Sequence, residues 1–318
     1  MAVTEPPIDY LYFELTRACN HRCLQCFNNS KYALEGELNT DGVRTVIRNF
    51  KQQGGHHLQL TGGDPFMRKD LLQILQYVKS MRFPLVTLST SSLLLNEVRI
   101  GWLEGTVDAI CHSLDGFALE HDVLRGIKCW DQSVKAIRLS SERGFRTYVC
   151  ACLTPPLLER IEEFMDLLVS LGVKQVKLAQ IGDVGRKEVP SDWRGSQLDP
   201  VEIHERVESL KGVYSDALQI QQSFTYLVMP PSIDRDGIVC DPLGDLYPVI
   251  GYLPKHWICG RAAPGWRLEP ERLADYQNAV GRVLRTGLAK IGKGKPVNWW
   301  TLLHDELVSS APVKVYSL

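Results

Sequence analysis

The stretch DYLYFELTRACNHRCLQC, residues 9–26, joins a strand pattern to three cysteines. Residues 9–15 are mostly apolar or aromatic and predict a buried strand. Cys19, Cys23 and Cys26 follow in the spacing C-x3-C-x2-C, so we expect a tight loop that leaves the end of the strand. Thiolate sulfur is the soft ligand that iron–sulfur clusters require. Three thiolates in one loop can therefore bind three irons of a [4Fe–4S] cluster and leave the fourth iron open.

The composition is that of a soluble globular protein with a sizeable core, since 44% of the 318 residues are hydrophobic and 23% are charged. A formal net charge of −1 gives no reason to expect nucleic acid or an anionic membrane as a partner. No apolar run approaches the ~20 residues of a membrane-spanning helix, and residues 1–7 do not resemble a signal peptide. Nine cysteines without a secretion signal indicate thiols and metal ligands, so we expect a cytoplasmic protein.

Strand and helix patterns alternate along residues 8–187. After the first strand, strands are predicted at 57–61, 83–88, 107–113, 146–153 and 175–179, and helices from about 40, from about 70, and at 97–103, 130–143 and 157–171. Six β–α units with short loops predict a parallel sheet with helices outside it. The predicted fold class is therefore α/β: a partial (β/α)6 TIM-like barrel with a small α+β C-terminal extension.

Unusual polar and glycine residues stand where the predicted strands end. Gly62, Gly63 and Asp64 follow the second strand, and residues 89–92, a serine and threonine run, follow the third. Ser113 and Asp115 come at the end of the fourth strand and share one side of it by the two-residue period. Active sites of such barrels collect at the carboxyl ends of the strands. Glycines also permit close backbone approach, so these positions predict a binding site at that edge.

On these motifs the chain, over roughly residues 8–186, resembles radical SAM enzymes. The cysteine loop matches the cluster motif of that family, and residues 61–65, TGGDP, resemble its glycine-rich motif. Residues 111–116 and 121–126, with Gly185-Arg186, resemble the subgroup that includes the molybdenum cofactor cyclase and SPASM or twitch enzymes. Two positions depart from the pattern: Gln25 stands where an aromatic residue is usual, and the glycine motif ends in Asp rather than Glu.

The resemblance implies a mechanism and a set of cofactors. Cys19, Cys23 and Cys26 would hold one [4Fe–4S] cluster whose open iron chelates S-adenosylmethionine. An electron from a donor such as flavodoxin or ferredoxin would cleave the sulfonium, and the 5′-deoxyadenosyl radical would abstract a substrate hydrogen. The implied S-adenosylmethionine contacts are the methionine ammonium at the glycine motif and the ribose or methionine at the fourth strand: Gly62, Gly63, Asp64, Ser113 and Asp115.

The region after the barrel divides into a connector, 188–222, and a twitch-like hairpin with C-terminal helices, 223–318. Helical patterns at 200–210, 270–291 and 297–307, and a strand pattern at 218–229, fall in this region. The hairpin, with 241–244 as its turn, resembles the cysteine-bearing hairpin of twitch and SPASM extensions. Only Cys240 and Cys259 are present here, and Val249 stands where the longer extension has cysteine. Two thiolates are too few for a four-thiolate cluster, so we predict no auxiliary cluster.

The substrate is expected to be a ribosomal peptide or a natural-product precursor, because a twitch-like remnant is typical of enzymes acting on these. Epimerisation or another redox-neutral outcome is one hypothesis, with Cys240 first and Cys111 second as catalytic hydrogen donors. Radical tailoring of a sugar or nucleoside is an alternative. The fold alone does not choose between reactions. A non-catalytic protein that binds the cluster and S-adenosylmethionine, and a zinc-binding module, remain as the non-enzymatic alternatives.

Overall fold

The structure is a computed structural model that describes residues 8–181, 185–193, 200–223, 237–248, 255–291, 303 and 305–307. Its strands are β1 (Tyr10–Glu14), β2 (His57–Thr61), β3 (Leu85–Thr90), β4 (Ala109–Ser113), β5 (Arg146–Leu153), β6 (Gln175–Gln180), β7 (Gln219–Ser223), β8 (Ile238–Cys240), β9 (Asp245–Tyr247), β10 (Gly260–Arg261) and β11 (Arg267–Leu268). Its α-helices are α1 (Thr40–Gln52), α2 (Leu71–Met81), α3 (Glu97–Gly101), α4 (Ala118–Arg125), α5 (Trp130–Glu142), α6 (Pro155–Glu159), α7 (Ile161–Ser170), α8 (Pro200–Tyr214) and α9 (Pro270–Ile291). Short 3-10 helices are η1 (Pro65–Met67), η2 (Ser191–Trp193) and η4 (Lys255–Trp257).

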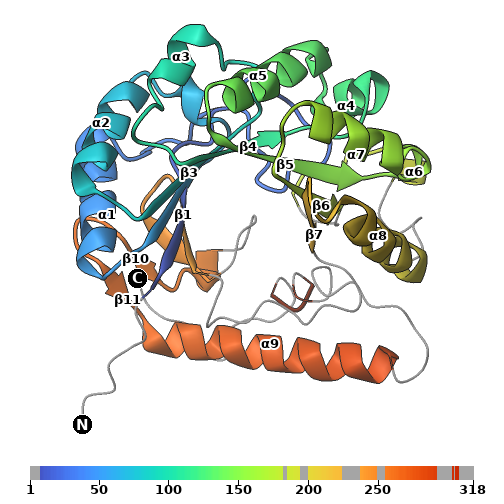
Figure 1. The fold of residues 1–318 in the computed structure, drawn as a ribbon. Helices are drawn as coiled ribbons and strands as arrows, with labels where there is room; N and C mark the ends of the chain where they lie inside the picture. The colour runs from blue at the N-terminus through green and yellow to red at the C-terminus, as the bar shows by residue number, and fades with distance from the viewer. Residues whose placement is uncertain are drawn as a thin grey trace.

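These strands form one sheet in the order β11-β10-β9-β8-β1-β2-β3-β4-β5-β6-β7. β1 to β7 are parallel to one another, and β8 runs parallel to β1 on its other side. The sheet curves into an open arc with α1 to α8 along its outer side, while α9 crosses the side on which the arc is open (Figure 1). The predicted α/β fold with a parallel sheet is confirmed.

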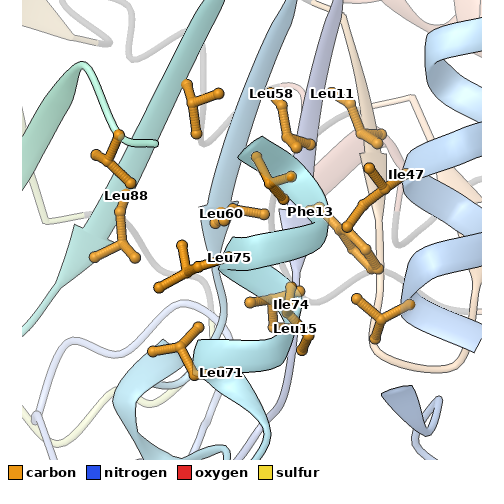
Figure 2. Packing of buried hydrophobic residues seen from close by; sticks show 14 of the residues in the cluster. Leu11, Phe13, Leu15, Ile47, Leu58, Leu60, Leu71, Ile74, Leu75 and Leu88 are labelled. Carbon is orange, nitrogen blue, oxygen red and sulfur yellow. The ribbon is translucent and has the colours of Figure 1, made fainter. Parts of the chain in front are cut away.

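The core lies between the convex face of the sheet and the helices. Leu11 and Phe13 of β1 alternate with half-buried tyrosines, and both are fully buried. Figure 2 shows them packed with leucines of β2 and with Ile47 of α1 and Leu75 of α2. Burying each such side chain contributes about 1.5–3 kcal/mol. The alternation leaves the concave face of the sheet free to carry polar and thiol groups.

Most elements lie where the sequence predicted them, with three differences. The expected helix over 157–171 is broken at Arg160 into α6 and α7. Helix α4 was not predicted; it ends at Gly126, whose φ of +68° places it in the left-handed region. The helix and strand predicted from 200 and from 218 are present as α8 and β7, but they are not a mere connector, because β7 adds a seventh parallel strand beside β6. Asn39 caps α1, accepting a hydrogen bond from the Gly42 amide.

The predicted hairpin after the barrel is present as β8 and β9, which are antiparallel around the turn 241–244. β10 and β11 continue it as further antiparallel strands. Val249 and most of the helix expected over 297–307 lie outside the described residues. Within the described part of the chain, no helix is both long and apolar enough to cross a membrane.

Candidate active site at the carboxyl ends of the strands

The cysteine loop follows β1, and backbone amides point at two of its sulfurs. The His21 amide donates to Cys19 Sγ at 3.4 Å, and the Ser30 amide donates to Cys26 Sγ at 3.3 Å. Burial raises the pKa of Cys19 to about 12, so a thiolate there requires a nearby positive charge. Iron would supply that charge, since a thiol that coordinates a metal ion is deprotonated. The donors and the buried thiols fit an iron–sulfur cluster.

The spacing of the three sulfurs bears on the zinc alternative. Zn–S bonds of about 2.3 Å place tetrahedral sulfurs roughly 3.8 Å apart. Among the described residues, the only three ligand atoms all within 4.8 Å of one another belong to His121, Asp122 and Cys129, not to the cysteine loop. That group already has partners: Asp122 accepts from the amides at the start of α5, and the Asp115 amide donates to His121 Nδ1. The three loop sulfurs do not form such a compact group.

The glycine motif after β2 packs closely against the start of the cysteine loop and is hydrogen-bonded to it. The Gly63 amide donates to Thr16 O at 2.6 Å, and the Asp64 amide donates to Ala18 O at 2.9 Å. A Cβ on Gly63 would lie 2.2 Å from Ala18 O, and one on Gly62, whose φ is +145°, would lie 2.4 Å from Thr16 O. Only glycine permits this approach. The close approach is to the backbone of the cysteine loop, and the contact of Gly62 and Gly63 with S-adenosylmethionine stays a prediction.

Asp64 is fully buried and its carboxylate has many donors. Oδ1 accepts from the Phe66 amide at 2.9 Å and so caps η1. Oδ2 accepts from Thr90 Oγ1 at 2.9 Å, from the Ser91 amide at 2.9 Å and from Ser91 Oγ at 2.6 Å. These bonds tie the glycine motif to the end of β3. A direct contact between Asp64 and S-adenosylmethionine stays a prediction.

Asp115 is equally buried and joins the end of β4 to three other elements. It forms an ion pair with Arg125 at 2.7 Å, and its Oδ1 accepts from the Cys152 amide at 2.9 Å. Gln25, the unusual residue of the cysteine loop, donates to Oδ2 at 3.3 Å. Arg125 Nη1 lies 3.8 Å from Cys23 Sγ. The pair therefore places one cation against the sulfur that lacks a described backbone donor. Sequence reasoning assigned Arg125 no role.

The segment after β6 packs on the outside of the same loop. Arg186 Nη1 donates to Cys23 O at 2.7 Å, Nη2 donates to Ser30 O at 3.1 Å, and its amide donates to Cys26 O at 2.9 Å. A Cβ on Gly185 would lie 2.3 Å from Cys26 O, so this position also requires glycine. The Gly185-Arg186 pair, noticed in the sequence by resemblance, thus fixes the path of the cysteine loop.

The remaining thiols divide between the two faces of the sheet. Cys111, Cys150 and Cys152 are half-buried and have the parity of Ser113, so they face the concave side. Burial raises the pKa of Cys111 to about 12, which keeps it a neutral thiol. Cys240, in contrast, is fully buried in the hydrophobic cluster with its Sγ directed to Asp241 O at 3.5 Å.

Cys259 lies in the same cluster as Cys240 and directs its Sγ to Leu246 O at 3.3 Å. Burial raises the pKa of Cys259 to about 12. Both thiols of the hairpin region are therefore held as neutral groups among apolar side chains. This placement agrees with the absence of an auxiliary cluster, which stays a prediction.

Comparison with known proteins agrees with this geometry. The profile described as Radical SAM superfamily matches residues 13–173. An AdoMet-dependent heme synthase from Oleidesulfovibrio alaskensis is 26% identical over 64% of this chain and 52% of its own length. A probable GTP 3′,8-cyclase from Sulfurisphaera tokodaii is 24% identical over 66% of this chain and 64% of its own. The match thus spans about half of the first relative and under two thirds of the second.

Two solved structures share the fold. Streptococcus suis SuiB bound to its precursor peptide SuiA superposes with a TM-score of 0.66 at 17% identity, covering 77% of this chain and 60% of SuiB. Native anSMEcpe with bound AdoMet and the Cp18Cys peptide also gives 0.66, at 14% identity, covering 84% of this chain and 80% of that one. At such identities the likeness establishes a common fold.

Proposed function

This chain belongs to the radical SAM superfamily, and we propose that Cys19, Cys23 and Cys26 hold the [4Fe–4S] cluster that this family uses together with S-adenosylmethionine. One observation carries the assignment: each of the three sulfurs has a donor, from the amides of His21 and Ser30 and from the Arg125 guanidinium. When bound, the cluster supplies the electron that cleaves S-adenosylmethionine to a 5′-deoxyadenosyl radical. The protein's own groups place the cofactors and the substrate.

The backbone at Gly62 and Gly63, together with Ser113, is proposed to contact S-adenosylmethionine. These positions lie at the carboxyl ends of β2 and β4, on either side of β3 and next to the cysteine loop. Asp64 and Asp115 are proposed to act mainly by holding these segments, because their oxygens already accept hydrogen bonds from β3, β5 and η1. The concave face beyond them is where a substrate hydrogen would meet the radical.

The proposed substrate is a ribosomal peptide or a natural-product precursor. Two proteins of the same fold, SuiB and anSMEcpe, were solved with bound peptides, which supports this class. For a redox-neutral outcome such as epimerisation, we propose Cys111 as the hydrogen donor in place of Cys240. The Cys111 S–H bond would break as a substrate C–H bond forms, and an electron from the flavodoxin or ferredoxin donor together with a proton from solvent would then restore the thiol.

The test is anaerobic reduction of the reconstituted protein with dithionite in the presence of S-adenosylmethionine. We expect 5′-deoxyadenosine and about four irons per chain, as one cluster requires. The Cys23→Ala variant should lose both the product and most of the iron, while Cys129→Ala, a matched thiol outside the loop, should keep them. A wild-type protein that binds S-adenosylmethionine without cleaving it would instead be a non-catalytic binder, and about eight irons would indicate an auxiliary cluster.

Radical tailoring of a nucleotide-like small molecule is the second candidate, favoured by the relatives named probable GTP 3′,8-cyclase. The two candidates differ in what accelerates 5′-deoxyadenosine formation. Nucleosides and nucleotides would do so in the second case, and peptides in the first.

A further inference from the structure

A cavity of about 500 Å³ lies at the carboxyl ends of β1 and β8, between the residues that follow the cysteine loop and the β8–β9 hairpin. Its volume falls within the range of small-molecule sites. Glu14, the last residue of β1, contributes to its wall, and so does Asn28, two residues after Cys26. Glu14 has the parity of Tyr12, which is half-buried on the concave face. The cavity therefore continues the concave face beside the proposed cluster.

The charges around this cavity are unequal. Its lining includes four acidic residues, Glu14, Glu35, Asp241 and Asp245, and two basic residues, Arg17 and Lys255, so the lining has a formal charge of −2. Two of the carboxylates are compensated: Glu14 pairs with Arg17 at 2.7 Å, and Asp245 pairs with Arg261, from outside the lining, at 3.1 Å. In the part of the chain that the structure describes, Glu35 and Asp241 form no ion pair.

Two buried oxygen-bearing groups in the wall have unused capacity to accept hydrogen bonds. Asn28 is only 4% exposed, its Nδ2 donates to Glu14 Oε1, and its Oδ1 has no donor among the described residues. Asp241 is 6% exposed, and both of its recorded donors, the amides of Leu243 and Asp245, contact Oδ1 at 2.9 Å. A buried acceptor without a donor costs free energy, which a ligand that donates hydrogen bonds would recover.

The electrostatics of Asp241 agree with an uncompensated site. Burial raises its pKa to about 6, the two amide bonds oppose that rise, and the charges of Asp245 and Glu14 add to it. A positive group in the cavity would reverse this effect. Burial also raises the pKa of Glu14, against the influence of Arg17 and Asn28. The wall is thus arranged around negative charge that the protein only partly neutralises.

We propose that this cavity binds a positively charged amino group of the substrate, so that the substrate is an amine or a lysine-bearing peptide. The inference rests on the proposed function, because it makes the cavity a part of the substrate site. An ammonium group offers three donors, and the acceptors that the wall leaves open to it are Asn28 Oδ1 and the Asp241 carboxylate. Tyr247 supplies an aromatic ring to the same wall, and aromatic faces attract ammonium groups; the ring of Tyr32 already has the Lys31 ammonium 4.7 Å from its centre. The volume exceeds what a bare metal ion needs.

The test compares two probes on the reconstituted protein with S-adenosylmethionine: Nα-acetyl-lysine amide and its uncharged analogue Nα-acetyl-norleucine amide. Calorimetric titration should show that the lysine probe binds on the order of tenfold or more tightly than the norleucine probe. Asp241→Asn, which keeps an oxygen for the Leu243 and Asp245 amides, should remove most of that preference. Glu142→Gln makes the same change of charge on the exposed face of α5 and should preserve it.

Equal binding of the two probes, or an undiminished preference in Asp241→Asn, would overturn the proposal. Thermal unfolding of Asp241→Asn separates loss of binding from loss of the fold. Failure of the amine site can also be distinguished from failure of the proposed radical chemistry. Wild-type protein that lacks 5′-deoxyadenosine formation but prefers the lysine probe would retain the amine site without the radical chemistry. The reverse pattern would retain the radical chemistry and discard the site.

Discussion

The carboxyl edge of the sheet has two parts, which differ in how far the protein compensates their buried carboxylates. Around the cysteine loop, Asp64 and Asp115 are fully buried, and their oxygens accept from backbone amides, hydroxyls and a guanidinium. Around the cavity at β1 and β8, Asn28 and Asp241 are nearly as buried, but Asn28 Oδ1 has no donor and both recorded donors to Asp241 contact Oδ1 alone. The two carboxylates of the first part are compensated by the protein itself, whereas the second part keeps Asn28 Oδ1 without a donor and Asp241 without an ion pair among the described residues.

The difference indicates different tasks. Buried carboxylates whose oxygens accept several hydrogen bonds hold the donating segments rigidly, and rigidity is what loops that position a cluster need. An unsatisfied acceptor is a cost to the folded protein unless something binds it. Mutations should therefore have opposite effects in the two parts. Removal of a carboxylate near the cysteine loop should destabilise the protein, and neutralisation of one in the cavity should stabilise it.

The largest expected effect is that of Asp115→Ala. The substitution leaves the buried Arg125 without its partner, and breaking such a pair costs about 3–5 kcal/mol. Urea unfolding of variant and wild type would measure the difference. The control is Glu97→Ala, which breaks the exposed pair with Arg143 and should change stability little. Equal losses in the two variants would mean that the Asp115 network is no more important than a surface ion pair.

Much of the first part could be predicted from the sequence. The bounds of β2 and β5 agree with the prediction because their hydrophobic alternation is regular and their ends are marked by glycine or polar residues. Helix α4 was missed because its N-cap position, Phe117, gives no capping signal and its apolar Leu119 is 71% exposed. The pairing of Arg125 with Asp115 joins two elements whose relation only the fold defines.

The second part could be predicted less well, since it depends on how β8 meets β1. The hairpin and its turn were predicted, but the face on which Cys240 lies was not. β8 pairs with β1 so that Cys240 is opposite Phe13, a core residue, and the thiol consequently points into the core. A strand of three residues does not reveal its buried face by alternation. Asn28 and Asp241 line the same cavity only because the fold brings together residues more than 200 apart in sequence.

The next prediction concerns the thiols of the two faces. If the product is redox-neutral, Cys111→Ala should abolish it, because Cys111 lies on the concave face. Cys240→Ala should mainly reduce stability, by about 1 kcal/mol, because it leaves a small void in the core. Product analysis by mass spectrometry in deuterated water and thermal unfolding would measure the two effects. Loss of product in Cys240→Ala alone would restore the donor that the sequence favoured.

The smallest expected effect is on the pH dependence of stability. The pKa of Asp241 is raised from 3.8 to about 6, so the unfolded chain loses this proton at a lower pH than the folded protein does. The associated stability is present at low pH and is lost as pH rises from about 4 through 6. Asp241→Asn removes this loss. The free energy of unfolding of the variant, relative to that of wild type, should therefore increase by about 1 kcal/mol between pH 5 and pH 8.

Thermal unfolding of both proteins across that range measures the difference, which isolates Asp241 from other titrating groups. Glu142→Gln, on the exposed face of α5, should show no such trend. Adding Nα-acetyl-lysine amide should reduce the difference in stability between Asp241→Asn and wild type at pH 8. The bound ammonium compensates the carboxylate of the wild type, whereas the variant has no carboxylate at this position and binds the probe more weakly. A gap that does not change with pH would mean that Asp241 is as well compensated as Asp115, and the contrast between the two parts of the edge would disappear.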